Sequence, residues 1–211
     1  ISTEAVRKMR KRIAEFLVER GSITGAQAKQ VFERSQESGK GVCAAILELG
    51  VMDRAALIAA FAPGFAGSVL DSLPQRIPDS TRALLSAKHA LKFGAIPFGI
   101  QVESATIPGR DLNILEVALL SPPKSEIVHR IEWLVRNRAG GLAIDEIRVR
   151  IVMPDAFLDA LERFHGLREL EIRLRHPEEV EPALRALVCG PDSPSEKRLA
   201  AEALPSNKPT T

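Results

Sequence analysis

The first third of the chain repeats itself. Residues 12–36 align with residues 41–65 at a constant offset of 29 (50 minus 21), which places Gly21 on Gly50 and Phe32 on Phe61. A fixed period of this length marks a supersecondary unit that buries its apolar face only by stacking on its neighbour. The chain is therefore expected to begin with two copies of one small unit packed together.

Each copy has the pattern of a helical hairpin. A first apolar segment ends at Gly21 or Gly50, and glycine readily takes the left-handed conformation that ends a helix. Thr24 and Asp53 follow, and their side chains can accept hydrogen bonds from the free N–H groups of a second helix. Apolar positions recur at helical spacing on both sides of the turn. The sequence predicts a bundle of four short helices, in two duplicated hairpins, over residues 1–66.

The composition changes after the repeats. Residues 67–92 contain Pro74, Pro78 and short apolar runs, which are typical of a connector, with one helix predicted over residues 79–90. Two strand patterns follow at residues 91–103 and 113–120. The segment between them contains Pro and Gly, which suit a turn, so an antiparallel pair is expected.

A strand, proline, helix pattern then recurs in three segments, 113–135, 146–164 and 168–188. Proline suits the first turn of a helix, where its missing N–H has no partner in any case. Residues 93–190 are predicted to form an α/β sandwich subdomain with a small mixed sheet and helices on one face. The expected fold class is therefore α+β. The Pro- and Ser-rich residues 191–211 are predicted to be a flexible tail.

The order of these parts carries a family resemblance. The segment "RIAEFLVERGSITGAQAKQVFERSQESGKGVCAAILELGVMDRAALIAAF", then "VLDSLPQRIPDSTRALLSAKHALKFGAIPFG" and the strand–helix units, resembles the N-terminal domain of type II secretion and type IV pilus assembly ATPases. This domain type is known as MshE-N or the GspE N-terminal domain. The resemblance covers residues 10–166 and implies a regulatory role in which the domain docks a hexameric ATPase onto a protein of the inner-membrane platform.

Some members of this family bind cyclic di-GMP through the duplicated motif, so the resemblance implies a second candidate function. Arginine can pair with a phosphate or a guanine edge, glycine allows close backbone approach, and apolar side chains can cover a base. If the nucleotide binds, the resemblance implies contacts from Arg12, Ile13, Phe16, Leu17, Gly21 and Lys40.

The motif is incomplete in both copies. In the first copy, Ala14 stands where the family motif has its early glycine, and Ser35 stands where the motif has glutamine. In the second copy the basic residue, the early glycine and the glutamine are replaced by Gly41, Cys43 and Gly64. Losing a charge-assisted hydrogen bond costs about 1.5–3 kcal/mol. Protein docking is therefore the leading hypothesis, and a cyclic di-GMP receptor is the alternative.

Several other classes of function are disfavoured by the sequence. The chain has no GxxxxGK[ST] loop to hold nucleotide phosphates, so it is predicted to be non-catalytic. The four histidines share no ligand spacing, and neither a metal nor another cofactor is expected. With a net charge of only +2, the field of the whole molecule does not attract nucleic acid, and no nucleic-acid partner is expected. The basic run at residues 7–12 is interpreted as a solvated helix start.

Two further expectations concern location and core. No apolar run is long enough to span a membrane, and Cys43 and Cys189 suggest no disulfide framework, so a cytoplasmic protein without membrane insertion is predicted. Trp133 and the stripe of Ile127, Ile131 and Leu134 lie at helical spacing and are predicted to pack in the core against the sheet.

Overall fold

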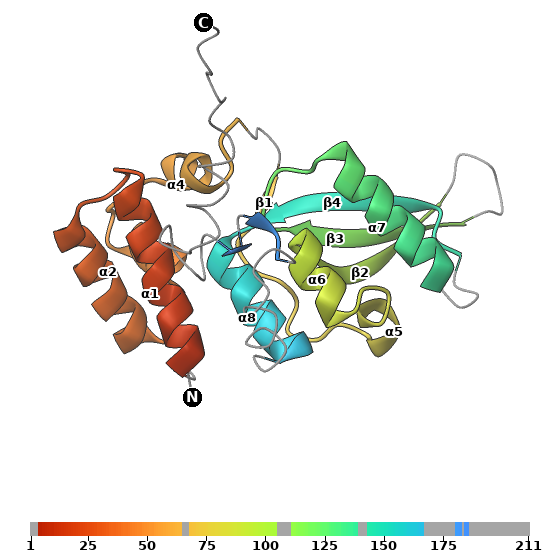
Figure 1. The fold of residues 1–211 in the computed structure, drawn as a ribbon, viewed down its shortest axis with the longest axis horizontal. Coiled ribbons are helices and arrows are strands. Elements are labelled where there is room, and N and C mark those ends of the chain that lie inside the picture. Colours follow the sequence, from red (N-terminus) through yellow and green to blue (C-terminus); the bar gives the residue numbers. More distant parts are fainter. Residues whose placement is uncertain are drawn as a thin grey trace, which may run out of the picture.

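The two repeats fold as two helical hairpins. The computed structural model describes residues 4–64, 68–104, 111–138, 143–166, 180–182 and 184–185. Helices α1 (Glu4–Glu19) and α2 (Gly25–Ser38) form the first hairpin, and α3 (Val42–Glu48) and α4 (Arg54–Phe61) form the second (Figure 1). The predicted bundle of short helices is confirmed.

The backbone of the two hairpin turns is equivalent residue by residue. Gly21 and Gly50 both take the left-handed conformation, with φ of 66° and 64°. In each turn the glycine N–H donates to a carbonyl three residues back, and the next N–H donates to a carbonyl five residues back. This is the pattern of a Schellman helix end. The N–O distances are 2.8 and 3.2 Å for Gly21–Val18 and Gly50–Leu47, and 2.9 and 3.1 Å for Ser22–Leu17 and Val51–Ile46.

The second helix of each hairpin begins with the predicted cap. The Thr24 side chain accepts the Gln27 N–H, and Gln27 in turn accepts the Thr24 N–H, which completes a capping box. The Asp53 carboxylate accepts the Ala56 N–H at 2.7 Å. Local sequence signals therefore set both turns and both helix starts.

The second half of the chain forms a four-stranded mixed sheet. Strands β1, β4 and β3 are parallel, and β2 lies antiparallel to β3 at one edge, in the order β1-β4-β3-β2. This confirms the predicted mixed sheet, the antiparallel pair and two of the three strand–helix units. The elements are β1 (Val69–Leu70), α5 (Asp79–Arg82), α6 (Ala87–Phe93), β2 (Ala95–Ser104), β3 (Asp111–Leu119), α7 (Ser125–Arg138), β4 (Glu146–Val152) and α8 (Pro154–His165).

Two details of the predicted connector differ from the structure. The single helix expected over residues 79–90 is two helices, α5 and α6, because the chain turns out of the helical conformation between Arg82 and Ala87. The connector also contributes β1, whose two residues pair with Ile151 and Val152 of β4. A strand of two residues has too little alternation to be recognised from the sequence.

The two faces of the sheet differ in chemistry. Leu115, Val117 and Ile151 are buried in one apolar core with residues of the helices, and Figure 1 shows α6 and α7 on the same side of the sheet. The alternate residues of β3 and β4 form a charged face. Its contacts are Arg150 Nε–Glu116 Oε1 at 3.0 Å, Gln101 Nε2–Glu116 Oε2 at 3.1 Å and Arg148 Nη1–Glu103 Oε1 at 2.8 Å.

The predicted core position of Trp133 is wrong. Ile131 and Val135 of α7 are fully buried, whereas Trp133 is 66% exposed. Successive residues of a helix are 100° apart, so a residue between Ile131 and Val135 in the sequence points to the opposite side of α7. The prediction rested on the apolar character of tryptophan and did not take account of the side of the helix on which Trp133 lies.

A buried carboxylate joins the helical half to the sheet half. Asp155, in the first turn of α8, is 6% exposed and accepts the N–H groups of Cys43 and Ala156 at 3.0 and 2.9 Å. It therefore satisfies free N–H groups at the starts of both α3 and α8. The approach is so close that a Cβ on Gly41 would lie 2.0 Å from Asp155 Oδ2.

The remaining predictions for this part of the chain lie largely outside the described residues. The third strand–helix unit is described only at residues 180–182 and 184–185, where the Glu181 carboxylate accepts the Leu184 N–H at 2.9 Å and the Ser121 hydroxyl at 3.2 Å. The predicted tail, residues 191–211, lies wholly outside. The domain boundaries stay predictions.

We expect Asp155→Asn to lower the free energy of unfolding by about 1–3 kcal/mol, because an amide leaves one of the two buried N–H groups facing another donor. Urea unfolding at neutral pH measures this loss. Asp79→Asn is the control on the surface; it breaks an exposed ion pair with Arg82, and its expected cost is below about 1 kcal/mol. Equal costs for the two variants would contradict the role given to Asp155.

The same site predicts a pH dependence. Burial raises the pKa of Asp155 above that of an ordinary carboxyl group, despite the N–H groups that it accepts. The folded chain therefore binds more protons than the unfolded chain between the two pKa values, and acidification through that range favours folding at this site. The stability of the wild-type chain relative to Asp155→Asn should increase as the pH falls from 7 toward the ordinary carboxyl pKa. A constant difference across a urea-unfolding series would contradict this.

Candidate functional site

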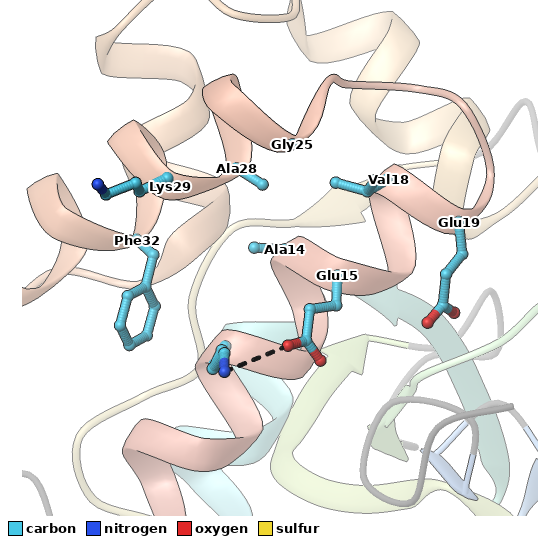
Figure 2. Close-up of a pocket in the computed structure, with 9 residues that line it drawn as sticks. Ala14, Glu15, Val18, Glu19, Gly25, Ala28, Lys29 and Phe32 are labelled. Carbon is cyan, nitrogen blue, oxygen red and sulfur yellow. Dashed lines mark ion pairs between the residues drawn. The ribbon is translucent and has the colours of Figure 1, made fainter. Parts of the chain in front are cut away.

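A groove lies on the first hairpin, between α1 and α2. Its cavity volume is about 430 Å³, and Figure 2 shows the residues that line it. Both helices contribute stripes at positions i, i+3, i+4 and i+7, so that one face of each helix is turned to the groove. The lining residues are Lys11, Ala14, Glu15, Val18 and Glu19 from α1, and Gly25, Ala28, Lys29 and Phe32 from the α2 segment.

Small residues make this groove. Ala14, Gly25 and Ala28 carry at most a methyl group where the two helices approach each other, so the space above them stays open. Val18 and Phe32 are half-buried and supply the larger apolar side chains of the groove. The site is therefore an apolar trough along a helix pair, which is the shape that accepts a further helix.

The rim of the groove is charged but balanced. Lys11 lies 3.5 Å from Glu15, and Lys29 lies 3.9 Å from Glu33. Glu19 lies 40% exposed at the end of α1. Such a rim does not favour a ligand that carries strong charge of a single sign. It matches an apolar ligand that carries both positive and negative groups at its edges.

Arg12 lies beside the groove and is engaged by acidic neighbours. Its guanidinium makes an ion pair with Glu15 and lies 3.6 Å from Glu19. Its Nε and Nη2 are buried and lack a hydrogen-bond partner within the described part of the chain. The arginine thus has spare donor capacity, but two carboxylates at this position oppose the approach of a phosphate.

The apolar members of the predicted nucleotide set serve the core. Ile13 and Leu17 are fully buried. Phe16 stacks on Phe61 of α4 with ring centroids 5.6 Å apart, and the Arg20 guanidinium lies 4.6 Å from its ring. None of these apolar residues lines the groove. Arg12 does not line it either, and it is linked to the groove only through its ion pairs with Glu15 and Glu19.

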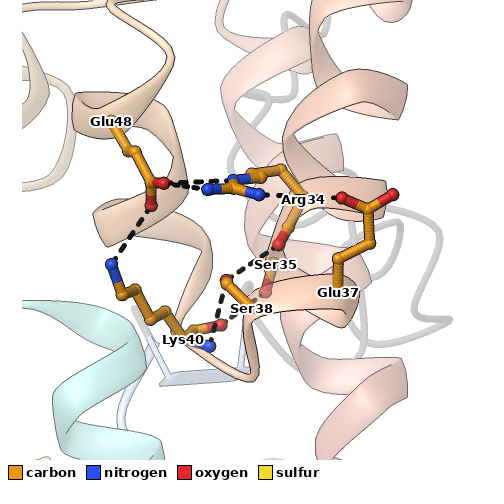
Figure 3. Close-up of polar contacts among 6 residues, drawn as sticks. All are labelled: Arg34, Ser35, Glu37, Ser38, Lys40 and Glu48. Atoms are coloured by element: carbon orange, nitrogen blue, oxygen red, sulfur yellow. Dashed lines mark hydrogen bonds and ion pairs between the residues drawn. The ribbon is translucent and has the colours of Figure 1, made fainter.

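Lys40, the other predicted basic contact, belongs to a separate polar cluster between α2 and α3 (Figure 3). Glu48 makes ion pairs with Arg34 and, at 3.3 Å, with Lys40. The hydrogen bond from Arg34 lowers the pKa of Glu48, with Lys40 adding to the effect, and the same bond to Glu48 raises the pKa of Arg34. Glu48 is the repeat counterpart of Glu19, so each copy places a glutamate against its basic side chain.

Ser35, which stands where the motif has glutamine, has a structural role here. It is fully buried, and its hydroxyl donates to the Lys40 carbonyl at 2.7 Å (Figure 3). Ser38 accepts the Lys40 N–H at 3.3 Å in the same turn. These bonds close the α2–α3 connection and leave Ser35 unavailable to a ligand.

The basic run at the start of α1 is largely neutralised. Arg10 is paired with Asp159 of α8 at 3.2 Å, and Lys11 and Arg12 have the glutamate partners described above. Arg7 is exposed. Within the described residues there is also no group of His, Cys, Asp and Glu side chains that could hold a metal ion, and no helix that could span a membrane.

The groove itself was missed by reasoning from the sequence. The sequence pattern assigns no binding role to its residues on α2, Ala28, Lys29 and Phe32. The regular spacing of small residues on both helices was the available signal. It was not decisive, because a stripe of small residues fits a tightly closed helix pair as well as an open groove.

Comparison with known proteins gives one relevant sequence match. The type IV pilus assembly ATPase PilB of Thermus thermophilus is 23% identical to this chain over 155 residues. The match covers 74% of this chain but 16% of PilB, so the chain spans about one sixth of that relative. A scan against models of known protein families finds no match.

A solved structure of MshE with cdg also matches. It covers 72% of this chain and 97% of that chain at 17% identity, with a TM-score of 0.28, which is too low to support a structural equivalence. The resemblance predicted from the sequence is therefore confirmed through PilB. This chain is similar to part of a type IV pilus assembly ATPase.

Proposed function

We propose that this chain is a non-catalytic docking domain of a type II secretion or type IV pilus system, acting in the cytoplasm. Its partner is a protein of the inner-membrane platform or an ATPase of that system. The similarity to a pilus assembly ATPase supports the system, and the groove between α1 and α2 is the observation that carries the docking role.

The groove favours a protein helix as its occupant. An amphipathic helix can lay apolar side chains over Ala14, Ala28 and Phe32 and place charged side chains beside the mixed rim. Packing of a third helix onto α1 and α2 also resembles the way these two helices already pack on each other. Burial of apolar surface in the groove would supply the affinity for the partner helix, and the charged rim would set the orientation of that helix.

Cyclic di-GMP is the second candidate ligand. The Nε and Nη2 of Arg12 favour it, since they lack a hydrogen-bond partner among the described residues and a phosphate or guanine could accept from them, although Nη2 lies 3.6 Å from Glu19. The two glutamates beside Arg12 and the Glu48 partner of Lys40 oppose it. A nucleotide would have to displace these carboxylates in both repeats.

We expect Ala28→Arg to weaken binding of the platform component's purified cytoplasmic domain by roughly tenfold or more, because the longer side chain fills the groove. Calorimetric titration measures the change. Ala26→Arg is the matched control, since Ala26 is exposed on α2 and does not line the groove. Thermal unfolding should show both variants folded. No binding by the wild-type chain to any platform component or ATPase of its system would contradict the docking function.

Titration with cyclic di-GMP separates the two functions. If the chain is a docking domain, neither the wild-type chain nor Arg12→Ala should give heat at high nucleotide concentration. A receptor would bind the nucleotide, and Arg12→Ala would lose that binding because the guanidinium is the remaining charged contact of the first repeat. This second result would replace docking with second-messenger binding.

A further inference from the structure

Trp133 is the most exposed large apolar side chain of the described residues. It lies on α7, with 66% of its surface accessible, on the side of the helix that faces away from Ile131 and the sheet. Tryptophan combines a large apolar ring with an N–H donor, and it concentrates at boundaries between an apolar phase and water.

The surroundings of Trp133 on α7 are polar. The residues three and four positions away are His129, Arg130, Arg136 and Asn137, and all four are exposed. Arg130 is paired with Glu126 at 2.7 Å, whereas no ion pair involves Arg136 among the residues that the structure describes. These residues line neither the α1–α2 groove nor the pocket beside α5.

The neighbouring helix α6 adds positive charge. Lys88 and Lys92 are exposed on α6. Partial burial is the main cause that lowers the pKa of His89, and the charges of Arg138, Lys88 and Lys92 lower it further. The last turn of α7 therefore lies close enough to α6 for its charge to act there. Figure 1 shows both helices lying across the same side of the sheet.

The charge of this region differs from that of the whole chain. Residues 87–93 and 124–138 contain six lysines and arginines and two glutamates, an excess of four, whereas the net charge of the chain is +2. A cationic area with one protruding tryptophan is complementary to an anionic surface that has an apolar layer just beneath it.

We propose that the outer surface of α6 and α7, here called the α6–α7 surface (Lys88, Lys92, Trp133, Arg136 and Arg138), binds the face of a bilayer that contains anionic phospholipids. The indole of Trp133 enters the headgroup layer, and the lysines and arginines pair with lipid phosphates. This peripheral contact goes beyond the docking of a protein partner and uses a surface at the other end of the molecule from the α1–α2 groove (Figure 1).

A bilayer fits this surface better than an acidic protein does. A protein interface usually surrounds its central tryptophan with well-packed contacts that exclude water. Here the neighbours of Trp133 are long polar side chains, and the cations are spread over two helices. Such a spread suits a planar array of phosphates, where each lysine or arginine adds to the attraction independently.

Trp133 is the only tryptophan of the chain, so its fluorescence reports on this surface directly. The full 211-residue chain should float with vesicles of phosphatidylglycerol and not with vesicles of phosphatidylcholine. Its emission should shift to shorter wavelength on binding, because the indole leaves water. Added salt should weaken the binding, since the cations remain near the surface of the bilayer.

Substitutions test the residues. Lys92→Glu and Arg136→Glu should each reduce binding to phosphatidylglycerol vesicles by at least roughly fivefold, because each reversal removes one positive charge, worth about fivefold, and adds a negative one. Trp133→Ala should also reduce flotation. Arg7→Glu is the matched charge control, because Arg7 is exposed on α1 at the other end of the molecule. Equal losses in Arg7→Glu and Arg136→Glu would overturn the proposal in favour of a nonspecific charge effect.

Two other results would overturn it. The first is failure of the wild-type chain to float with phosphatidylglycerol vesicles. The second is a shift of Trp133 emission with polyglutamate and none with the vesicles, which would assign the surface to an acidic protein. Neither result bears on the α1–α2 groove, whose test uses a protein partner and Ala28→Arg.

Discussion

The arrangement of the molecule depends on one carboxylate. Asp155 accepts an N–H group from the start of α3 and another from the start of α8, and these helices belong to the two halves of the chain. Helix starts are otherwise the places where backbone donors stay unsatisfied. Gly41 is required beside it, because any side chain would occupy the position of the carboxylate. The same two halves are also joined by the Arg10–Asp159 ion pair and by a shared apolar core.

Much of the fold could be predicted because its signals are local. Glycine and a capping residue define each hairpin turn within a few residues, and alternation defines the longer strands. The contact between Asp155 and Cys43 joins residues 112 positions apart, so no local sequence pattern predicts it. The strand β1 was missed because two residues carry no period, and Trp133 was misplaced because hydrophobic character alone does not tell which side of a helix faces the core.

Charge pairing explains why the candidate site differs from a nucleotide site. Glu19 and Glu48 occupy equivalent places in the two repeats and lie against Arg12 and Lys40. These contacts could not be derived from the motif, since the motif concerns the positions that a ligand would touch and not the acids beside them. The basic residues can be identified in the sequence, but whether they are available to a ligand depends on the acidic neighbours that the folded hairpins bring close to them.

The two repeats share one backbone pattern but have different structural roles. Their turns are equivalent in backbone, yet Cys43 and Leu57 stand where the first copy has Ala14 and Ala28. Leu57 is fully buried, whereas Ala28 is half-buried; Ala14 and Cys43 are both buried. One descendant of the ancestral hairpin has thus become an internal support, while the other kept an open surface. Selection on binding can therefore change the open face of the first copy, while the opposite face of α1 keeps its contact with α8 through Arg10 and Asp159.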